Sequence, residues 1–331
     1  MQRALALCLR NYPPPAQRPE AAQLRRRGIN LQLRLRLPQR RFVRILRPGR
    51  GSLRRRDAMS LVIATTERRA APVSAGSAQA SGSLGNFFQG LRPDWHARWA
   101  WENYEPTILN LSRQFGLRRV CEIGGGRDPL FTAEQAARHG VDLIVNDIDA
   151  GELALTPAGL ETARFDIAGD LSEPDVRRGA YDLMVSRMVF EHVHDVEQAW
   201  RNIHELLAPG GVALAFFPTL WAPVFTLNHI LPEKASRAIV HALYPARRDG
   251  GGDPKFPAFY DWCRGNPALL GPMLNRAGFS DVHVQPFWGH EYFKRMPGIR
   301  EADHAFNALS AKIGWHFVTT HAYVVVRKGR D

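Results

Sequence analysis

A short apolar segment that ends in an acid and three glycines constrains the fold of this chain more than any other feature. Residues 119–126 read RVCEIGGG. Strands that end in Gly-rich turns are typical of α/β proteins, in which a ligand contacts the backbone at the carboxyl edge of a parallel sheet. Because glycine has no Cβ, Gly124, Gly125 and Gly126 allow a ligand to approach the main chain. The segment therefore predicts a parallel sheet with a ligand site after this strand.

Glu122, the acid at the end of the segment, narrows the kind of ligand. A carboxylate at this place repels a pyrophosphate, whereas it attracts an ammonium group and tolerates a nearby sulfonium. S-adenosylmethionine carries both cationic groups. Glu122 therefore predicts this compound as the cofactor.

Two further segments end in acids at the spacing of neighbouring strands. Residues 141–147 are apolar up to Asp147, about 20 residues past the glycines, where an acid commonly accepts hydrogen bonds from ribose hydroxyls. Nicotinamide-dependent oxidoreductases share this feature, so Asp147 alone leaves both classes open. Residues 164–167 predict a third strand end, at which Asp166 accepts from the adenine amine and Ile167 packs on the ring.

Strand and helix patterns alternate over residues 119–217, which predicts right-handed crossovers and a parallel sheet. The later strands are expected at residues 181–186, 212–217, 282–286 and 323–327.

Five motifs occur in a fixed order along this region: VCEIGGG, VNDID, RFDIAGDL, YDLMVSRMVFEHVHD and LLAPGGVALAFF. Over residues 100–217 they resemble the class I S-adenosylmethionine-dependent methyltransferases, above all the broad methyltransferase-domain group that includes quinone-biosynthesis and small-molecule enzymes. The resemblance implies an α/β, Rossmann-like, seven-stranded and mostly parallel sheet, with an antiparallel last strand beside strand six. The cofactor-binding residues that it implies are Glu122, Gly124, Gly125, Gly126, Asp147, Ile148, Asp166, Ile167, Ser186 and Arg187.

The first motif departs from the E-x-G-x-G-x-G pattern of the family at its last glycine, where Asp128 stands. That glycine usually permits close packing of helix on strand, so a wider turn is expected. Proline is favourable in the first turn of a helix, and Pro129 is therefore expected to begin the next helix.

The composition predicts three regions. Residues 1–58 are an Arg-rich tail expected to be disordered, residues 59–94 a linker or N-terminal segment, and residues 95–331 a methyltransferase domain. An insert at residues 218–278 separates strands five and six, where the family has one helix. Within it, residues 235–243 and 268–277 predict helices.

The net charge of +12 comes from the tail. Residues 1–56 contain 16 arginines and a single acid, Glu20, so the rest of the chain is slightly acidic. The tail is compatible with an arm that binds nucleic acid or anionic lipid, with an organelle transit peptide, and with translated sequence upstream of a start at Met59. No nucleic-acid partner is expected of the domain itself.

Cysteine usage and hydropathy suggest a cytoplasmic protein. Cys8, Cys121 and Cys263 lack metal or redox spacing, and no stretch of 18 uncharged apolar residues predicts a membrane span. The apolar run at residues 220–230 leaves open a peripheral contact with a membrane surface. The sequence does not predict an oligomeric state.

Two histidines are candidates for the base that removes a proton from a methyl acceptor. His192 follows strand four, near where the family places the transferring methyl, and His290 follows strand six at the expected acceptor edge. Each is also compatible with a bracing role. Some quinone-pathway relatives bind a divalent cation through E-x-x-E-H, but Met188 replaces the first acid ahead of Glu191 and His192, so no metal is expected.

These features predict methyl transfer to a small molecule, at oxygen, with a glycan or sugar, a quinone-like compound or another secondary metabolite as acceptor. The alternatives are a nucleic-acid methyltransferase or binder that uses the basic tail, a nicotinamide-dependent oxidoreductase, and a non-catalytic scaffold that retains the fold. The sequence SRMV after strand four lacks the Asn-Pro-Pro-Tyr type of signature that base methylases carry.

Overall fold

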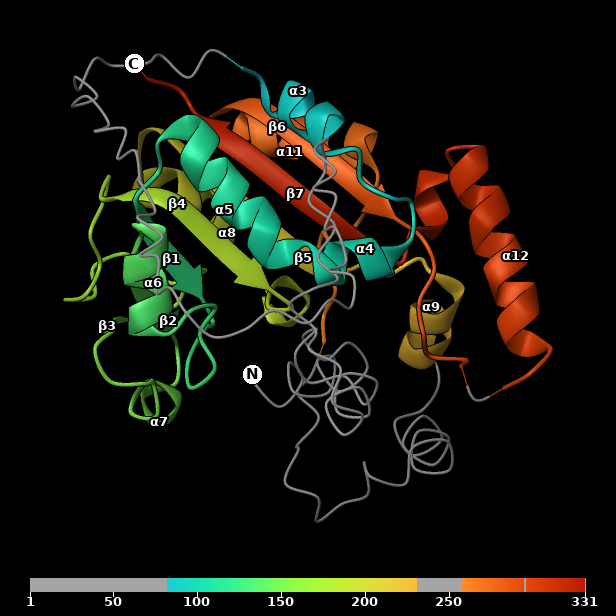
Figure 1. Ribbon diagram of the computed structural model, residues 1–331, viewed down its shortest axis with the longest axis horizontal. Coiled ribbons are helices and arrows are strands. Elements are labelled where there is room, and N and C mark those ends of the chain that lie inside the picture. Colours follow the sequence, from blue (N-terminus) through green and yellow to red (C-terminus); the bar gives the residue numbers. More distant parts are fainter. Residues whose placement is uncertain (1–81, 231–257, 295, 331) are drawn as a thin grey trace, which may run out of the picture. The chain divides into compact units, whose positions relative to one another are not determined.

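A computed structural model describes residues 82–230, 258–294 and 296–330. They form a seven-stranded sheet in the order β3-β2-β1-β4-β5-β7-β6 (Figure 1). The strands are β1 Arg119–Ile123, β2 Asp142–Asp147, β3 Glu161–Arg164, β4 Tyr181–Arg187, β5 Leu207–Pro218, β6 Phe279–Phe287 and β7 His321–Lys328. The first five run parallel, and β7 lies antiparallel between β5 and β6. The predicted fold class is confirmed, including the antiparallel last strand.

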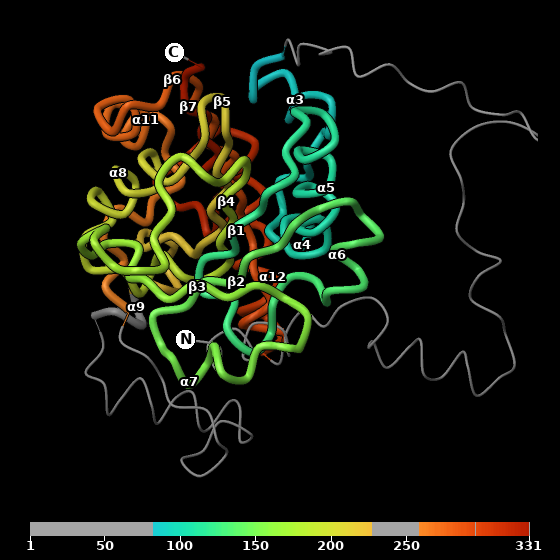
Figure 2. Tube along the Cα trace, turned by 90° about the vertical axis from the view of Figure 1, so that its left-hand side faces the viewer, coloured from blue at the N-terminus to red at the C-terminus, as the bar shows by residue number. Residues whose placement is uncertain are grey.

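The central strands are apolar on both sides because helices cover both faces of the sheet. Figure 2 shows α3, α4, α5 and α6 on one side and α8 and α11 on the other. The bounds of the first group are α3 Leu84–Leu91, α4 Ala97–Glu102, α5 Tyr104–Phe115 and α6 Ala133–His139, and those of the second are α8 Val196–Leu206 and α11 Pro267–Arg276. A hydrophobic core lies on each face of the sheet, and alternate residues of β4 point into one or the other. Leu183 and Val185 pack in the core with α5, and Met184 packs in the core with α8.

The remaining helices lie near the carboxyl ends of the strands. They are α7 Ala150–Leu153, α9 Pro223–Ile230, α12 Ile299–Lys312 and the short 3-10 helices η3 Phe190–His192 and η5 His316–Val318. Among the helices that the structure describes, none is both long and apolar enough to cross a bilayer.

The folded part begins before residue 95, because α3 lies within the segment expected to be a linker. Its apolar residues Leu84, Phe87 and Phe88 share one face and are buried, while Ser83 caps its first turn. Asp281 of β6 accepts a 2.8 Å hydrogen bond from Leu84 N. The spacing of these apolar residues is that of an amphipathic helix, and this signal was present in the sequence.

Two other expectations also need correction. The third strand ends at Arg164, not at Ile167, and Phe165 to Ile167 belong to the following loop. The helix after the glycines begins at Ala133, with Thr132 as its cap, so Pro129 lies in a wide loop and not in the first helical turn. The expected helix at residues 268–277 is present as α11, whereas residues 1–58 and the expected helix at 235–243 lie outside the described residues.

Candidate cofactor and acceptor site

Neighbouring strand ends bring the predicted cofactor residues together. β1 lies between β2 and β4, and Ile123 pairs with both Asn146 and Ser186. The ends of these three strands therefore place Glu122, the glycine turn, Asp147 and Arg187 at one edge of the sheet.

The glycine turn is held close to β2. Gly125 N donates a 3.0 Å hydrogen bond to Asn146 O. A Cβ on Gly125 would lie 2.8 Å from Cγ1 of Val145 and 3.1 Å from the carboxylate of Glu122, so a side chain does not fit there. Gly124 and Gly126 have φ values of 72° and 44°, in the left-handed region that favours glycine. The backbone geometry thus favours glycine at all three positions.

Glu122 closes the loop that follows these glycines. Its side chain is buried, and Oε2 accepts a 2.6 Å hydrogen bond from Leu130 N. Burial raises the pKa of Glu122 to about 7, against the opposing effects of the Leu130 bond and the Arg187 charge. A nearby cation would favour the ionised form of this carboxyl group. The bond to Leu130 was not part of the sequence interpretation.

Arg187 and Tyr104 lie on the same face of the sheet as Glu122. The guanidinium carbon of Arg187 is 5.3 Å from the centre of the Tyr104 ring, a cation–π geometry. Tyr104 begins α5 and is buried, and burial raises its pKa well above the usual range. Among the described residues, neither the Tyr104 hydroxyl nor Nε of Arg187 has a hydrogen-bond partner. Buried polar atoms without partners are rare, so this pair is suited to a polar ligand.

The backbone is strained directly after Arg187. Met188 has φ 59°, a conformation that non-glycine residues seldom adopt, and its N–H donates a 2.7 Å bond to Phe216 O. Strain of this kind clusters at functional sites.

Asp147 ends β2 with one carboxylate oxygen engaged. Oδ1 accepts a 3.0 Å bond from Asp149 N, and Oδ2 has no partner within the described part of the chain. Burial raises the pKa of Asp147. The second oxygen is available for a ligand hydroxyl.

The two isoleucines of the predicted site differ in position. Ile148, next to Asp147, is 53% exposed at the sheet edge. Ile167 is buried in the core with Phe165, and its carbonyl accepts a 2.8 Å bond from Asn202. Asp166 accepts a 2.9 Å bond from Ala168 N within its own turn. Ile148 therefore offers an apolar surface at the edge, and Ile167 does not.

Glu191 and His192 lie in η3, directly after β4. Glu191 is buried, its Oε2 has no partner among the described residues, and burial raises its pKa to about 8. Nε2 of His192 lies 3.8 Å from Oε1 of Glu191. The two side chains thus form a close pair in which the carboxyl group is protonated near neutral pH.

The insert packs on this pair. Phe259 N and Tyr260 N donate 2.8 Å and 3.2 Å bonds to Glu191 O, and Asp261 accepts a 3.2 Å bond from Val196 N. The backbone is left-handed at Tyr260 (φ 54°) and Trp262 (φ 50°), so the segment is held in an uncommon conformation. No sequence pattern indicates this long-range contact. The apolar surroundings of Glu191 in VFEHV were a sign of its burial.

His290 follows β6 with both ring nitrogens engaged. Nδ1 accepts a 3.2 Å bond from Tyr292 N, and Nε2 lies 3.3 Å from Oδ1 of Asp303 in α12. His321, at the start of β7, is also buried, and burial, with smaller effects of His290 and His96, lowers its pKa to about 3. His290 has both nitrogens engaged and His321 is buried with a lowered pKa, so neither imidazole is well placed to take a proton from an acceptor. In the described ranges, no cluster of three or more His, Cys, Asp or Glu side chains could hold a metal ion.

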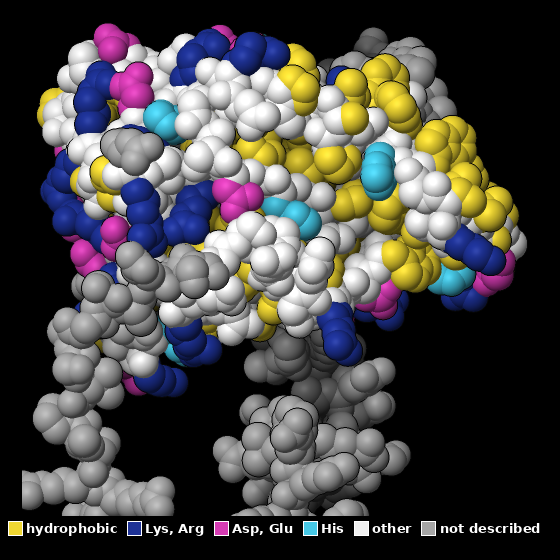
Figure 3. Space-filling view, turned by 90° about the horizontal axis from the view of Figure 1, so that it is seen from above, with side chains coloured by type: hydrophobic (Ala, Val, Ile, Leu, Met, Phe, Trp, Pro, Cys, Tyr) yellow, Lys and Arg dark blue, Asp and Glu magenta, His cyan; other side chains and the backbone are white. Residues whose placement is uncertain are grey.

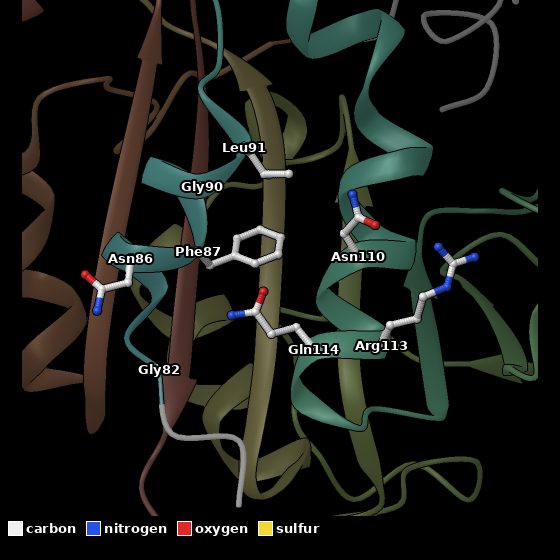
Figure 4. A pocket seen from close by; sticks show the side chains of 8 residues that line it. All are labelled: Gly82, Asn86, Phe87, Gly90, Leu91, Asn110, Arg113 and Gln114. Atoms are coloured by element: carbon white, nitrogen blue, oxygen red, sulfur yellow. The ribbon is translucent and has the colours of Figure 1, made fainter. Parts of the chain in front are cut away.

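A surface depression of about 540 Å³ lies away from this edge, between α3 and α5 (Figure 4). Its lining residues are Gly82, Asn86, Phe87, Gly90, Leu91, Asn110, Arg113 and Gln114. It contains none of the predicted site residues and no acid.

The sheet order and the glycine turn after β1 are those of the Rossmann-like fold of class I methyltransferases. Residues 95–247 match a family described as a methyltransferase domain. Two uncharacterised methyltransferases, from Mycobacterium strains JLS and KMS, are 28% and 29% identical over 196 and 199 residues. Each match covers 56% of this chain and 73% of the relative.

Solved methyltransferase structures are similar at low identity. Phosphoethanolamine N-methyltransferase 2 of Haemonchus contortus, in complex with S-adenosylmethionine, is 17% identical with a TM-score of 0.41. The match covers 69% of this chain and 52% of the Haemonchus chain, so this chain spans about half of that protein's length. An S-adenosylmethionine-dependent methyltransferase from Archaeoglobus fulgidus is 16% identical with a TM-score of 0.40, over 74% of this chain and 99% of that one.

Proposed function

We propose that this protein transfers a methyl group from S-adenosylmethionine to a hydroxyl oxygen of an uncharged small molecule. The observation that carries the proposal is the meeting of Glu122, Asp147 and Arg187 around a turn in which Gly125 tolerates no Cβ.

The residues at this edge fit the cofactor group by group. Glu122 lies where it would neutralise the ammonium group, and the unpartnered Oδ2 of Asp147 suits the ribose hydroxyls. Exposed Ile148 provides an apolar surface for adenine. Asp166, in the loop after β3, is the residue we assign to the adenine amine. Ser186 and Arg187 end β4 beside the glycine turn. When bound, the cofactor supplies a methyl group activated by the sulfonium charge, and the chain's own work is alignment and exclusion of water.

Apart from Asp261, which accepts a bond from Val196 N, the groups that pack on Glu191 are neutral where the structure describes them. Glu191 is protonated near neutral pH, and the insert residues on it include the aromatic Phe259 and Tyr260 and the buried thiol Cys263. Such surroundings favour an uncharged ring that carries a hydroxyl group, as a sugar or a quinol does.

His192 is the residue we assign to proton removal from the acceptor hydroxyl. It lies beside the end of β4, and its Nε2 is 3.8 Å from Oε1 of the buried Glu191. Glu191 is in this scheme a positioning residue. We assign His290 a positioning role as well, because its two nitrogens connect residue 292 to Asp303.

Calorimetry tests the proposal. The purified full chain is titrated with S-adenosylhomocysteine and, separately, with NAD. Binding of the first and no heat from the second supports the cofactor assignment, and the reverse result overturns it. Methyl transfer from labelled S-adenosylmethionine to a panel of sugars and quinols then tests the acceptor class, with anionic acceptors such as phosphoethanolamine as the comparison. A preference for the anionic compounds contradicts the neutral acceptor side.

A further inference from the structure

Helix α12 presents its apolar side to solvent. Its apolar residues recur at spacings of three and four, and we call this set the α12 stripe: Ile299, Ala302, Phe306, Leu309 and Ile313. Three of these side chains are strongly exposed, Ile299 by 48%, Leu309 by 58% and Ile313 by 63%. Figure 3 shows apolar side chains gathered toward the end of the molecule where α12 lies.

Two aromatic residues extend the stripe beyond the helix. Trp315 is 45% exposed and Phe317 is 51% exposed. The Trp315 ring lies 5.9 Å from that of Phe306, so it is continuous with the middle of the stripe.

The side of α12 that faces the rest of the protein is polar. The buried residues of the helix are Asn307 and Ser310. Asp303 contacts His290, and Asn307 donates a 2.8 Å bond to Asp303 O. A helix on the surface of a globular protein normally has the reverse arrangement. Large exposed apolar patches mark interaction sites, so the α12 stripe is such a candidate.

The spacing of the stripe indicates that its partner is a helix. A repeat of three and four residues gives the narrow seam along which two helices pair by interlocking side chains. A helix that lies on a membrane surface has a wider apolar face than this, whereas two paired helices need only a narrow seam.

The charges of α12 favour a second copy over a lipid surface. Arg300 and Lys312 are balanced by Glu301 and Asp303, and Arg300 forms an ion pair with its neighbour Glu301. A helix without net charge gains little from anionic lipid, which attracts helices rich in Lys and Arg. The same balance lets two identical helices meet without net repulsion.

We propose that the protein forms a homodimer in which the α12 stripes of two copies pair in antiparallel orientation. A two-fold axis near Phe306 makes the stripe complementary to itself, with Ile299 of each copy beside Ile313 of the other. The dipoles of the two helices then also run in opposite directions, which is favourable. Because Asp303 contacts His290, the dimer supports the acceptor side of each copy.

Sedimentation of the full chain at several concentrations tests the dimer. Wild type is expected to sediment as a dimer, and Leu309→Glu as a monomer with an unchanged circular dichroism spectrum. Leu269→Glu, in α11, is the matched control, because Leu269 is also an exposed leucine, at 39%. It is expected to leave the dimer intact. A wild-type monomer at every concentration, or a dimer that survives Leu309→Glu, overturns the proposal.

Cross-linking tests the orientation. Ile299→Cys and Ile313→Cys variants are mixed and oxidised with copper phenanthroline, and disulfide-linked dimers are expected from the mixture and not from either variant alone. Linked dimers from Ile299→Cys alone indicate parallel helices and contradict the arrangement. A monomer that binds anionic vesicles through the stripe assigns it to lipid. If the protein is a monomer and the thiol of Leu309→Cys resists alkylation, residues of the same chain cover the α12 stripe. Either outcome refutes the dimer.

Discussion

The carboxylate of Glu122 accepts a 2.6 Å hydrogen bond from the backbone N–H of Leu130, so the acid that ends β1 also closes the loop after the glycines. A group that shapes the site therefore changes its charge close to neutral pH, because burial raises its pKa to about 7. This property makes the role of Glu122 measurable.

Cofactor binding is expected to release a proton. A cationic ammonium group beside Glu122 lowers its pKa, so the fraction of Glu122 that is protonated in the free protein at pH 7 loses its proton on binding. The dissociation constant for S-adenosylhomocysteine should then fall as pH rises through 7. Calorimetry in two buffers of different ionisation enthalpy measures the release. Glu122→Gln, which keeps an acceptor for Leu130, should abolish it, and an unchanged release in this variant contradicts the assignment.

Asp147→Ala is expected to weaken binding of S-adenosylhomocysteine at least tenfold, about the loss of a hydrogen bond to a charged group. The matched control is Asp142→Asn, at the exposed opposite end of the same strand, which should bind normally. Equal affinities of wild type and Asp147→Ala would remove Asp147 from the site.

His192→Ala should reduce turnover far more than cofactor affinity, because removal of a general base typically costs 10²-fold or more in rate. His194→Ala serves as the control, since His194 is exposed on the same turn and stacks on Phe259. Parallel losses of turnover and affinity in His192→Ala would indicate a bracing role.

Glu191 makes the fold sensitive to high pH. Its folded-state pKa, about 8, is above its ordinary value, so the folded protein binds more protons than the unfolded one between about pH 4 and pH 8. The free energy of unfolding should therefore fall as pH rises through this range. Glu191→Gln should flatten the dependence and be more stable above pH 8 by a few kcal/mol, since one pKa unit corresponds to about 1.4 kcal/mol. Urea unfolding at several pH values measures this effect, with Glu134→Gln, whose side chain is 84% exposed, as a control without effect.

Gly125→Ala should destabilise the protein by about 1–3 kcal/mol, the usual effect of a group forced into a packed site. Gly271→Ala, in α11, is the control, because its Cβ meets nothing within 4 Å and alanine favours helices. Thermal unfolding compares the two. A neutral Gly125→Ala would show that the turn has room for a side chain.

The sequence predicted the features that depend on local pattern. Strand periodicity and the glycines located the sheet and the turn, and the apolar segment before Asp147 correctly predicted a strand that ends there. Ile148 and Ile167 could not be ranked in this way, because each follows an acid in the sequence, and the burial of Ile167 depends on its packing in the core. Tyr104 stood out as an aromatic residue, but its contact with Arg187 joins residues far apart in sequence. The packing of residues 259–261 on Glu191 likewise depends on how the insert folds back.

The position of β7 has a consequence for synthesis. It lies between β5 and β6, and among the strands that the structure describes β6 pairs with β7 alone. A chain emerging from the ribosome can therefore assemble β1 to β5 early, but β6 must wait until residues 321–328 have left the exit tunnel. Until then, the exposed edge of β5 is open to pairing with other chains, so translation that stalls near the end of the message should yield aggregates.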